Sequence, residues 1–418
     1  MQIIIFEDER VSFLKPLANL KPVYGLVSGF LSLDEKFQHY IGAAHPLSYH
    51  LRRYLAPFFS EQHPDRLVNS IEDDDVLFVN GRLICDKRVA QIVATGGVDS
   101  GHALVQGDDL VLARVRRDRL RLDQDEMLTD LIDTAELSSG LVVDKVSGFR
   151  MIRYVWDAIG FHAAELKNDS ETLELGCIEG NVHPSAVMVN RSNVYIGADA
   201  VVKAGAVIDA TEGFVAVGCG AVVEPQAVLM NSVYLAPWSK ANIGAKIYSN
   251  VAVGLASKVG GEVEDSIIEP FANKQHDGFL GHSYLSSWCN LGAGTNTSDL
   301  KNNYSKIVLD MGSHKVLTDL QFLGLIMGDH SKSSINSMFN TGTIVGTSAN
   351  VFGEGFPPKY IPSFSWAGSA AGIEPYELDK AVGTARKVME RRRVSMSLSY
   401  EAMFRFLALR EQGGEVFI

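Results

Sequence analysis

Apolar residues follow one pattern in the first 160 residues of the chain and a different one after about residue 190. In the first part, short apolar runs at residues 2–6 and 76–79 are bounded by charged residues. Continuous apolar runs of this length are typical of strands that are buried on both faces of a parallel sheet. We expect a further strand at residues 109–115 and helices at residues 31–41 and 47–59. The pattern predicts a mixed α/β unit.

In the second part, aliphatic residues recur every six positions. A period of six is neither the helical 3.6 nor simple strand alternation; it is typical of a parallel β-helix, in which three hexads make one coil. A glycine-rich β-sandwich is the alternative, but it would not keep this register across three segments. The repeating positions are Ile196, Val202 and Ile208; Val217, Val223, Leu229 and Leu235; and Ile247, Val253 and Val259.

The placement of glycine supports the β-helix. Of the 38 glycines, 20 lie in residues 192–355 and only 11 in residues 1–170. Small residues allow a chain to turn the corners between short strands. The register breaks after Val259, so we expect a loop or an irregular coil over residues 260–310.

Three domains follow from these patterns. The polar residues 165–171 are interpreted as a linker, and after Pro375 apolar residues recur at helical spacing. We predict a helix there and a second one near residues 400–410. The predicted boundaries are 1–165 for the α/β domain, 172–366 for the β-helix and 374–412 for the C-terminal helices.

Composition and charge narrow the class of protein. The 418 residues are 46% hydrophobic, which is typical of a globular chain, and the net charge is 38 − 50 = −12. Coating nucleic acid requires a basic surface, so we expect no nucleic-acid partner. The chain has no apolar run of roughly 18–20 residues, no basic flank before its first apolar run and no CxxC motif. We therefore expect no membrane span, reduced and buried cysteines and a cytoplasmic location.

Polar side chains are concentrated where the repeat fails. Residues 273–304 contain two histidines, two lysines, two tyrosines and many amides. A purely structural coil has no need of so many groups that are costly to desolvate, and loops on a rigid scaffold often carry function. We therefore expect the functional site in this stretch.

The same stretch carries a resemblance to a known family. Gly281-His282-Ser283-Tyr284, then residues 290–295 (NLGAGT) and residues 325–332 (LIMGDHSK), resemble the bifunctional sugar-1-phosphate nucleotidyltransferase/acetyltransferases of bacteria and archaea. The resemblance implies a Rossmann-like nucleotidyltransferase-type domain on a left-handed parallel β-helix. It also implies a homotrimer, with acetyl-CoA as co-substrate bound between neighbouring β-helices.

Site residues are carried over from this resemblance. His282 falls on the general base, and imidazole is suited to removing a proton from an amine near neutral pH. Asp299 stands where the bifunctional enzyme has an amide, which changes what that position can bind. The other substrate-binding residues are Lys258, Lys274, Tyr284, Asn290, Lys301, Asn303 and Tyr304, and the cofactor-binding residues are Gly292, Ala293, Gly294, Asp329, His330 and Lys332.

The N-terminal domain departs from the family's pattern. Its first strand leads into Glu7-Asp8-Glu9-Arg10 instead of a glycine-rich loop, and the first glycine is Gly25. The strand that ends in a magnesium-binding Asp in the family ends here in Gly81-Arg82, and an arginine cannot ligate Mg²⁺. We hypothesise that nucleotidyl transfer is lost or altered, and expect Mg²⁺ only if that activity remains.

These observations predict an acetyl-CoA-dependent N-acetyltransferase that acts on an amino-sugar phosphate or a nucleotide sugar. One alternative is an active sugar-1-phosphate nucleotidyltransferase, using UTP or dTTP, whose β-helix serves assembly. The other is a non-catalytic scaffold that binds sugar nucleotides. The fold alone does not separate the three.

Overall fold

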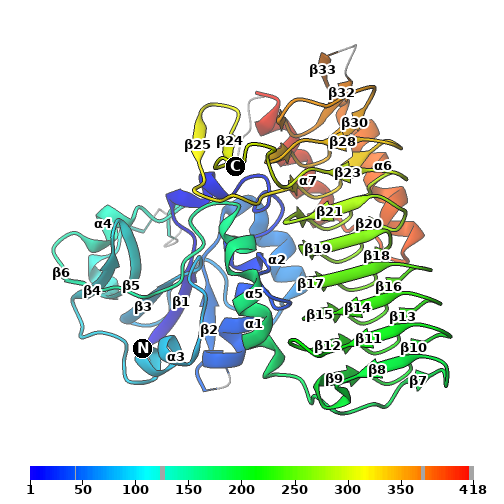
Figure 1. Cartoon of the computed structure of the whole chain (residues 1–418). Helices are drawn as coiled ribbons and strands as arrows, with labels where there is room; N and C mark the ends of the chain where they lie inside the picture. Colours follow the sequence, from blue (N-terminus) through cyan, green and yellow to red (C-terminus); the bar gives the residue numbers. More distant parts are fainter. Residues whose placement is uncertain (43, 123–127, 369–371, 414–418) are drawn as a thin grey trace.

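A computed structural model describes residues 1–42, 44–122, 128–368 and 372–413 (Figure 1). The N-terminal domain contains a six-stranded mixed sheet of order β2-β1-β3-β5-β4-β6. Strand β1 pairs in parallel with both β2 and β3, whereas β5 runs antiparallel to β3. Strands β1 and β3, at the first two predicted runs, are thus parallel to each other, as expected. Strand β5, at the third predicted run, is antiparallel to β3. The strands are β1 (Gln2–Phe6), β2 (Leu47–Tyr49), β3 (Asp75–Asn80), β4 (His102–Gln106), β5 (Asp109–Arg116) and β6 (Val142–Lys145).

The helix predicted at residues 47–59 is wrong in its first half. Leu47–Tyr49 is the edge strand β2, because its backbone continues the parallel ladder of β1. A 3-10 helix at Arg53–Leu55 leads into an α-helix that begins at Ala56, next to Pro57. Proline is favoured in the first turn of a helix, where its missing N–H costs nothing. The α-helices of this domain are α1 (Leu33–Phe37), α2 (Ala56–Gln62), α3 (Lys87–Ala94), α4 (Thr134–Ser138) and α5 (Asp157–Ser170).

The stretch interpreted as a linker is helical instead. Residues 165–170 form the last turns of α5, which lies with α1 and α2 between the sheet and the β-helix (Figure 1). Two of the three acidic residues in this stretch are buried ion-pair partners: Glu165 lies 3.0 Å from the ammonium of Lys36, and Asp169 also pairs with that group, whereas Glu171 is exposed. The charged residues of the last turns of α5 are thus explained mainly by buried ion pairs and not by an exposed linker.

Residues 181–368 form the left-handed parallel β-helix expected from the period of six (Figure 1). The ten repeating aliphatic positions all lie in one core inside the coils, which confirms the predicted interior column. Two of its faces belong to the large sheet, and a third face is formed by the short strands. The third face carries β7 (Asn181–Val182), β10 (Val201–Val202), β13 (Val222–Val223), β16 (Lys240–Ala241), β18 (Lys258–Val259), β20 (Asn273–Lys274), β27 (Lys332–Ser333), β30 (Asn350–Phe352) and β32 (Ser365–Gly368).

The large sheet supplies the other two faces. Its strands stack in parallel from coil to coil, and the longest of them bend around the corner between the two faces. They are β8 (Val187–Val189), β9 (Val194–Ile196), β11 (Val207–Asp209), β12 (Val215–Val217), β14 (Val228–Met230), β15 (Val233–Leu235), β17 (Lys246–Val253), β19 (Glu262–Ile268), β21 (Phe279–Gly281), β22 (Tyr284–Leu285), β26 (Leu325–Met327), β29 (Thr343–Val345) and β31 (Tyr360–Ile361).

Glycine turns only some of the corners. At one corner the left-handed backbone position is taken by Trp238, Phe271 and Trp288, with φ of 59°, 62° and 65°. Such φ values strain a residue with a side chain. The rings of Phe271 and Trp288 stack at 4.2 Å, so packing between successive coils compensates for this strain.

The coils were predicted to break over residues 260–310, but in the structure they continue beyond residue 260. Strands β19 to β22 continue the coils to Leu285, with Val263, Leu280 and Leu285 in the interior column. The segment that leaves the β-helix is 300–322, which carries a hairpin of β24 (Val308–Asp310) and β25 (Lys315–Leu317). The short strands β23 (Asn296–Thr297) and β28 (Met338–Phe339), which lie in the coils before and after this segment, pair with each other, and β33 (Gly372–Pro375) follows the last coil.

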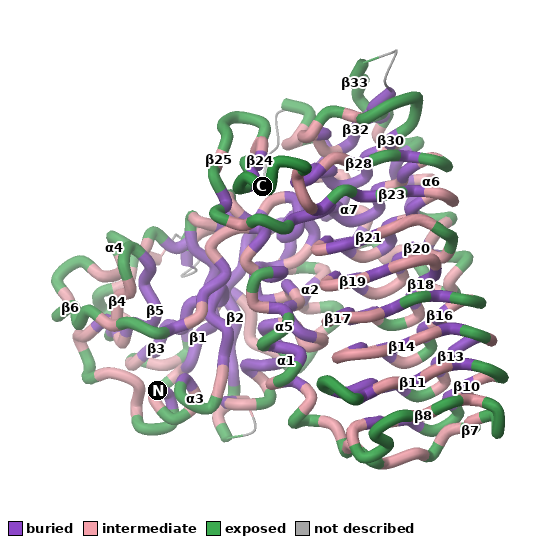
Figure 2. Tube along the Cα trace, in the orientation of Figure 1, coloured by how far each residue is buried: buried purple, intermediate pink, exposed green. Residues whose placement is uncertain are grey.

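The two predicted C-terminal helices are present as α6 (Leu378–Arg391) and α7 (Leu398–Glu411). Helix α7 packs on α2 and on the β-helix, so one core of buried residues runs through all three parts (Figure 2). Among the four cysteines, Cys85 and Cys289 are buried as expected, but Cys219 is exposed at a coil turn. In the described ranges we find no helix long and apolar enough to cross a membrane.

Candidate functional site

His282 lies at the corner between the two faces of the large sheet, between β21 and β22. Its backbone is left-handed, with φ of 43°, which directs the side chain outward from the coil. Asn250 and Asp265 occupy the same corner in the two preceding coils, and the Asn250 amide donates to Asp265 Oδ1 at 2.8 Å. His282 thus extends a column of polar side chains.

Two carboxylates and one ring hold the imidazole. His282 Nδ1 lies 2.8 Å from Asp299 Oδ2, and Nε2 lies 3.8 Å from Asp265 Oδ2. The ring of Phe322 stacks on the imidazole at 4.9 Å. The His282 side chain is 23% exposed, so the arrangement is fixed but open to solvent. With Nδ1–H donated to Asp299, Nε2 is left with a free lone pair.

Electrostatics favour a positive charge here. Burial lowers the pKa of His282, but the hydrogen bond with Asp299 and the charges of Asp265, Asp299 and Glu264 outweigh it, so the pKa is raised. Burial and the neighbouring carboxylates raise the pKa values of Glu264 and Asp265. A cation, either protonated imidazole or an ammonium group on a substrate, relieves this repulsion.

Sequence reasoning identified His282 and Asp299 but missed three of their neighbours. Asp265 lies one coil, or 17 residues, before His282, so the coil period could have identified it. Glu264 is its neighbour in sequence. Phe322 belongs to the far end of the segment that leaves the β-helix, and no sequence signal relates it to His282.

The same residues could hold a metal ion. In the part of the chain that the structure describes, one group of His, Cys, Asp and Glu side chains is close enough, formed by Glu264, His282 and Asp299 with ligand atoms within 4.8 Å of one another. One imidazole and two carboxylates suit a divalent transition metal.

Tyr284 faces away from this corner, toward the N-terminal domain. Its hydroxyl donates to Glu269 Oε1 at 2.6 Å and accepts from the backbone N–H of Val27 at 3.0 Å. Glu269 in turn pairs with Lys21, and Lys21 Nζ lies 3.4 Å from Asp329 Oδ1. Burial raises the pKa of Asp329 to about 6, against the opposing charge of Lys21. Tyr284 and Asp329 therefore belong to a buried polar contact between domains.

These contacts predict a structural phenotype for Tyr284→Phe. Loss of the hydroxyl leaves a buried N–H and a carboxylate oxygen without a partner, which costs about 1–3 kcal/mol per group. We expect a lower urea midpoint of unfolding, with the KM for the acceptor unchanged in the folded variant. A raised KM with unchanged stability would instead favour the substrate contact expected from the resemblance.

The third face of the β-helix carries Asn290 and Lys274. Isolated backbone bridges pair Asn290 with Asn273 and with Lys332 in the neighbouring coils. In a triangular coil this face is opposite the corner that holds His282, so one chain does not bring Asn290 and His282 together. The ammonium of Lys274 is buried and donates to the carbonyls of Gly260 and His276, at 3.1 and 2.7 Å, where a ligand from solvent does not meet it. Burial lowers the pKa of Lys274 to about 8.

Gly292, Ala293 and Gly294 form a coil turn next to this face. A Cβ at Gly292 would lie 2.3 Å from the Ser334 carbonyl, so the turn requires glycine there. The turn is thus explained by close packing of two coils; its predicted contact with the cofactor stays a prediction.

His330 is buried, whereas Lys332 is half-buried. His330 occupies the aromatic corner one coil beyond Trp288, stacks on that ring at 5.9 Å, and its Nε2 lies 2.7 Å from the Tyr400 hydroxyl of α7. Lys332 donates to the His330 carbonyl at 2.7 Å, and burial lowers its pKa to about 8. The stacking at this corner and the docking of α7 account for the His330 side chain, and the predicted contact of Lys332 with the cofactor stays a prediction.

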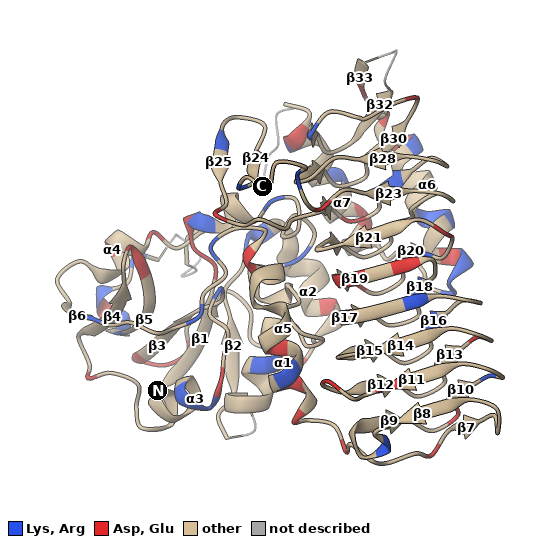
Figure 3. Ribbon diagram, viewed as in Figure 1, with Lys and Arg blue, Asp and Glu red and all other residues tan. Residues whose placement is uncertain are grey.

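Lys258 belongs to a basic cluster on the third face (Figure 3). Burial lowers the pKa of Lys258, and the positive charges of Arg392, Lys240 and Arg391 lower it further. Arg392, after α6, donates to Asn273 Oδ1 at 2.6 Å and so lies against the same face. The sequence indicated Lys258, and only the structure brings it together with Arg391 and Arg392.

Lys301 and Asn303 line a cavity of about 560 Å³ with Asn340 and Lys359, close to the Asp299 segment. Burial lowers the pKa of Lys359, and the charges of Lys301 and Lys315 lower it further. Two lysines that repel each other suit a negatively charged ligand. Tyr304 is 66% exposed and is not among the lining residues.

In the N-terminal domain, ion pairs fill the ends of β1 and β3. Glu7 accepts from the guanidinium of Arg52, with two contacts of 3.0 Å. Asp8 accepts from Arg82, whose other partner is Asp109 at 2.9 Å, and neither Asp8 nor Arg82 is exposed. Glu7 and Asp8, the first two acidic residues after this strand, are therefore neutralised within the protein and do not require a metal.

Comparisons with known proteins agree with the resemblance inferred from the sequence. Residues 3–178 match a family model described as sugar nucleotidyl transferase. A bifunctional sugar-1-phosphate nucleotidylyltransferase/acetyltransferase of Sulfurisphaera tokodaii is 26% identical over 229 residues, which are 54% of this chain and 50% of the relative. The chain thus spans about half the length of the curated relative that it matches. Both matches are to transferases.

Solved structures of two acyltransferases also match. The UDP-N-acetylglucosamine acyltransferase of Francisella novicida is 15% identical, with 52% of this chain and 73% of that chain covered and a TM-score of 0.25. The enzyme of the same name from Campylobacter jejuni is 16% identical, with 54% and 95% covered and a TM-score of 0.23.

Proposed function

Because the chain resembles the bifunctional sugar-1-phosphate nucleotidyltransferase/acetyltransferases, we propose that it is an acetyl-CoA-dependent N-acetyltransferase acting on an amino-sugar phosphate or a nucleotide sugar. The observation that carries this proposal is the pair His282–Asp299, with Nε2 open to solvent beside Asp265. An oriented imidazole with a free nitrogen is the usual general base for acyl transfer to an amine.

The chemistry follows from the contacts of the imidazole. Asp299 accepts the hydrogen of Nδ1 and so keeps the lone pair on Nε2. Glu264 and Asp265 attract the acceptor as an ammonium ion, which releases one proton before it reacts. Nε2 takes a further proton from the amine as the amine nitrogen bonds to the thioester carbonyl carbon. The C–S bond then breaks, and the leaving thiolate takes that proton from Nε2, which restores the base.

Two lysine-containing regions are candidates for the charged parts of the substrates. Lys301 and Lys359, in the cavity near Asp299, would bind the phosphate of the acceptor. Lys240, Lys258 and Arg392, on the third face, would bind the phosphates of coenzyme A. Arginine and lysine are the common partners of phosphate in proteins.

A homotrimer would join these regions into one site. Within one chain the third face is opposite the corner of His282, whereas in a trimer the corner of one β-helix can face the third face of the next. We therefore expect a native mass of three 45.6 kDa chains by light scattering. A monomer that is fully active in acetyl transfer would contradict this arrangement.

Asp299→Asn tests the role of the carboxylate. An amide still accepts the Nδ1 hydrogen but removes the charge, so the pKa of His282 should fall. The base form would then persist to lower pH, and the acidic limb of the kcat/KM profile should move to lower pH. Asp265→Asn should shift it in the same direction while leaving the Nδ1 contact intact. An unchanged limb in both variants would contradict His282 as the base.

The proposed function is tested by assaying the full chain with two sets of substrates. Free thiol release from acetyl-CoA is followed with a panel of amino-sugar phosphates and amino nucleotide sugars. Pyrophosphate release is followed with sugar-1-phosphates, each NTP and Mg²⁺. We expect turnover only in the first assay, because ion pairs fill the ends of β1 and β3. Turnover only in the second would favour the nucleotidyltransferase alternative, and binding without turnover would favour the scaffold.

A further inference from the structure

Residues 300–322, the inserted segment, leave the β-helix beside His282 and return beside it. Where the segment starts, Asp299 Oδ2 lies 2.8 Å from His282 Nδ1. Where it ends, the ring of Phe322 stacks on the imidazole, with the ring centroids 4.9 Å apart and the planes inclined by 25°. The two ends are paired with each other, because the N–H of Leu323 donates to the Asp299 carbonyl at 2.9 Å. Two contacts of the imidazole thus come from the paired ends of one segment.

The returning strand is also tied to the backbone of His282. The N–H of Gly324 donates to the His282 carbonyl at 2.9 Å, and a Cβ at Gly324 would lie 2.1 Å from the carbonyl oxygen of Gly281. Glycine allows two backbones to approach this closely. Leu323 is fully buried, so its side chain anchors the same strand in the core. Phe322 is therefore held two residues from a backbone contact with the residue on which its ring stacks.

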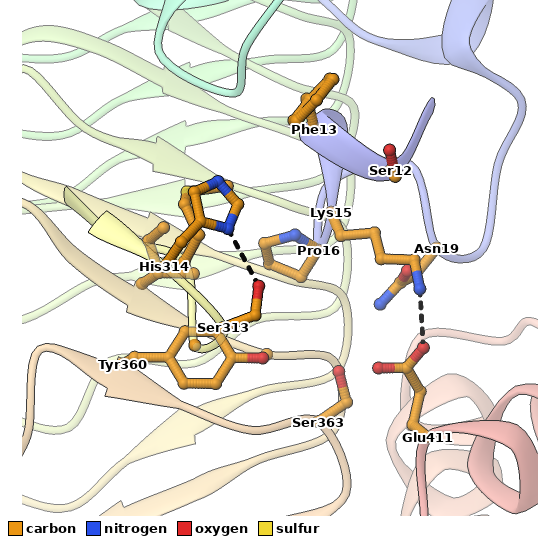
Figure 4. A pocket seen from close by; sticks show the side chains of 14 residues that line it. Ser12, Phe13, Lys15, Pro16, Asn19, Ser313, His314, Tyr360, Ser363 and Glu411 are labelled. Atoms are coloured by element: carbon orange, nitrogen blue, oxygen red, sulfur yellow. Dashed lines mark hydrogen bonds and ion pairs between the residues drawn. The ribbon is translucent and has the colours of Figure 1, made fainter. Parts of the chain in front are cut away.

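The far end of the inserted segment is packed as well. Leu309 of β24 is fully buried in the core that the N-terminal domain shares with the β-helix. A Cβ at Gly312, in the hairpin turn, would lie 2.6 Å from the ring of Tyr360, so the turn rests directly on that ring. Figure 4 shows the next two residues of the turn, Ser313 and His314, beside Tyr360 at the edge of a cavity. The inserted segment is packed at both ends and can hold its contacts with His282 in place.

The imidazole needs more than one contact to stay in one plane. The χ2 torsion of histidine is broad and roughly two-fold, so the side chain by itself leaves the ring plane open. The contact between Nδ1 and Asp299 fixes one ring atom, but the ring can still turn about the line that joins the two atoms. Stacking resists that rotation, because a turned imidazole loses contact with the face of Phe322. Asp299 and Phe322 together fix the direction of Nε2.

We propose that Phe322 is a positioning residue for His282, whose ring fixes the imidazole plane so that Nε2 points at the acceptor amine. The effect on turnover rests on the proposed function, whereas the stacking itself does not depend on it. Phe322 exchanges no proton with the substrates and acts only through His282. The inserted segment supplies the carboxylate and the ring as one unit, so the base is complete only when both of its ends are in place.

The proposal predicts that Phe322→Leu lowers kcat without lowering stability. Phe322 is 41% exposed, so a leucine there should leave the urea midpoint of unfolding unchanged. Without the stacked ring the imidazole can turn, and a displacement of about 1 Å can cost about 100-fold in rate, so we expect kcat to fall about 10- to 100-fold. The KM for either substrate should change little. Phe322→Tyr keeps the ring plane and should keep the wild-type kcat.

The pH profile separates positioning from the electrostatic role of Asp299. Phe322 carries no charge, and leucine keeps its apolar cover, so Phe322→Leu should lower kcat/KM at every pH and leave the acidic limb in place. The matched control is Phe352→Leu. Phe352 lies on the third face, is 38% exposed and packs on the ring of Trp366 at 5.6 Å. That variant should keep the wild-type kcat.

A measurement without turnover tests the stacking by itself. In NMR spectra of the full chain labelled with ¹³C in the histidine rings, the ring current of Phe322 should move the Cε1–H proton of His282 upfield. The resonance is identified by its loss in His282→Ala. We expect a downfield shift in Phe322→Leu and the wild-type position in Phe322→Tyr.

Three results would overturn the assignment: a wild-type kcat in Phe322→Leu, a raised KM for the acceptor with unchanged kcat, or a His282 resonance that Phe322→Leu does not move. The second would place the ring against the substrate instead of the imidazole. If the wild-type chain shows no acetyl transfer, the proposed function fails, and the resonance alone decides whether Phe322 fixes the imidazole.

Discussion

Replacing His282 by alanine is expected to lower kcat for acetyl transfer by roughly 10²- to 10⁴-fold, the usual contribution of a general base. The amine then loses its proton acceptor, while the donor and acceptor contacts on other elements remain. The KM for either substrate should change little. The measurement is steady-state thiol release over a range of pH, with native mass and urea unfolding to show that the variant is folded.

The matched control is His183→Ala. His183 is an exposed histidine at another coil turn, and its Nδ1 contacts only the neighbouring Ser185. That variant should keep the wild-type rate. If His282→Ala also keeps it, His282 is not the base, and its carboxylate neighbours serve another purpose such as holding a metal ion.

The second large effect is on stability. Replacing Arg82 by methionine should lower the free energy of unfolding by about 3–5 kcal/mol, because Asp8 and Asp109 lose a partner in a region that water does not reach. The Arg82 side chain has no exposed surface, and its guanidinium lies 2.6 Å from Asp8 and 2.9 Å from Asp109. Urea unfolding followed by fluorescence measures the difference.

Lys87→Met provides the comparison for Arg82→Met. Its pair with Glu171 has a similar length, but the two side chains are 77% and 61% exposed, so solvent screens the pair and the loss of stability should be far smaller than for Arg82→Met. Equal effects for the two variants would contradict a buried ion-pair network at the ends of β1 and β3. A folded Arg82 variant with new pyrophosphate release would show instead that these pairs block a nucleotide site.

The family resemblance was informative because it rests on local motifs. The motif Gly281-His282-Ser283-Tyr284 could be found from its residues, and so could Asp299, which stands where the family has an amide. For Tyr284 the motif does not indicate the contacts that the structure gives it. Two residues after a corner, its side chain lies on the face covered by the N-terminal domain and bonds to Glu269 and Val27.

The wrong secondary-structure predictions share one physical cause. Residues 47–59 are apolar enough for a helix, yet pairing with β1 makes Leu47–Tyr49 a strand. Residues 165–170 are polar enough for a linker, yet Lys36 and Arg150 make their carboxylates buried partners. In both cases a distant part of the chain overrides the local preference, and local composition does not record it.

The sequence by itself determined the β-helix, its interior column, the C-terminal helices and the histidine at the centre of the candidate site. These features repeat at a fixed period or lie within a few consecutive residues, so the spacing of residue types is sufficient evidence. Only the tertiary structure decided that Asp265 and Phe322 surround His282, that Tyr284 and Asp329 join two domains, and that Lys15 of the N-terminal domain pairs with Glu411 of α7. Most of these contacts join coils, domains and the C-terminal helix, and they depend on how the parts pack.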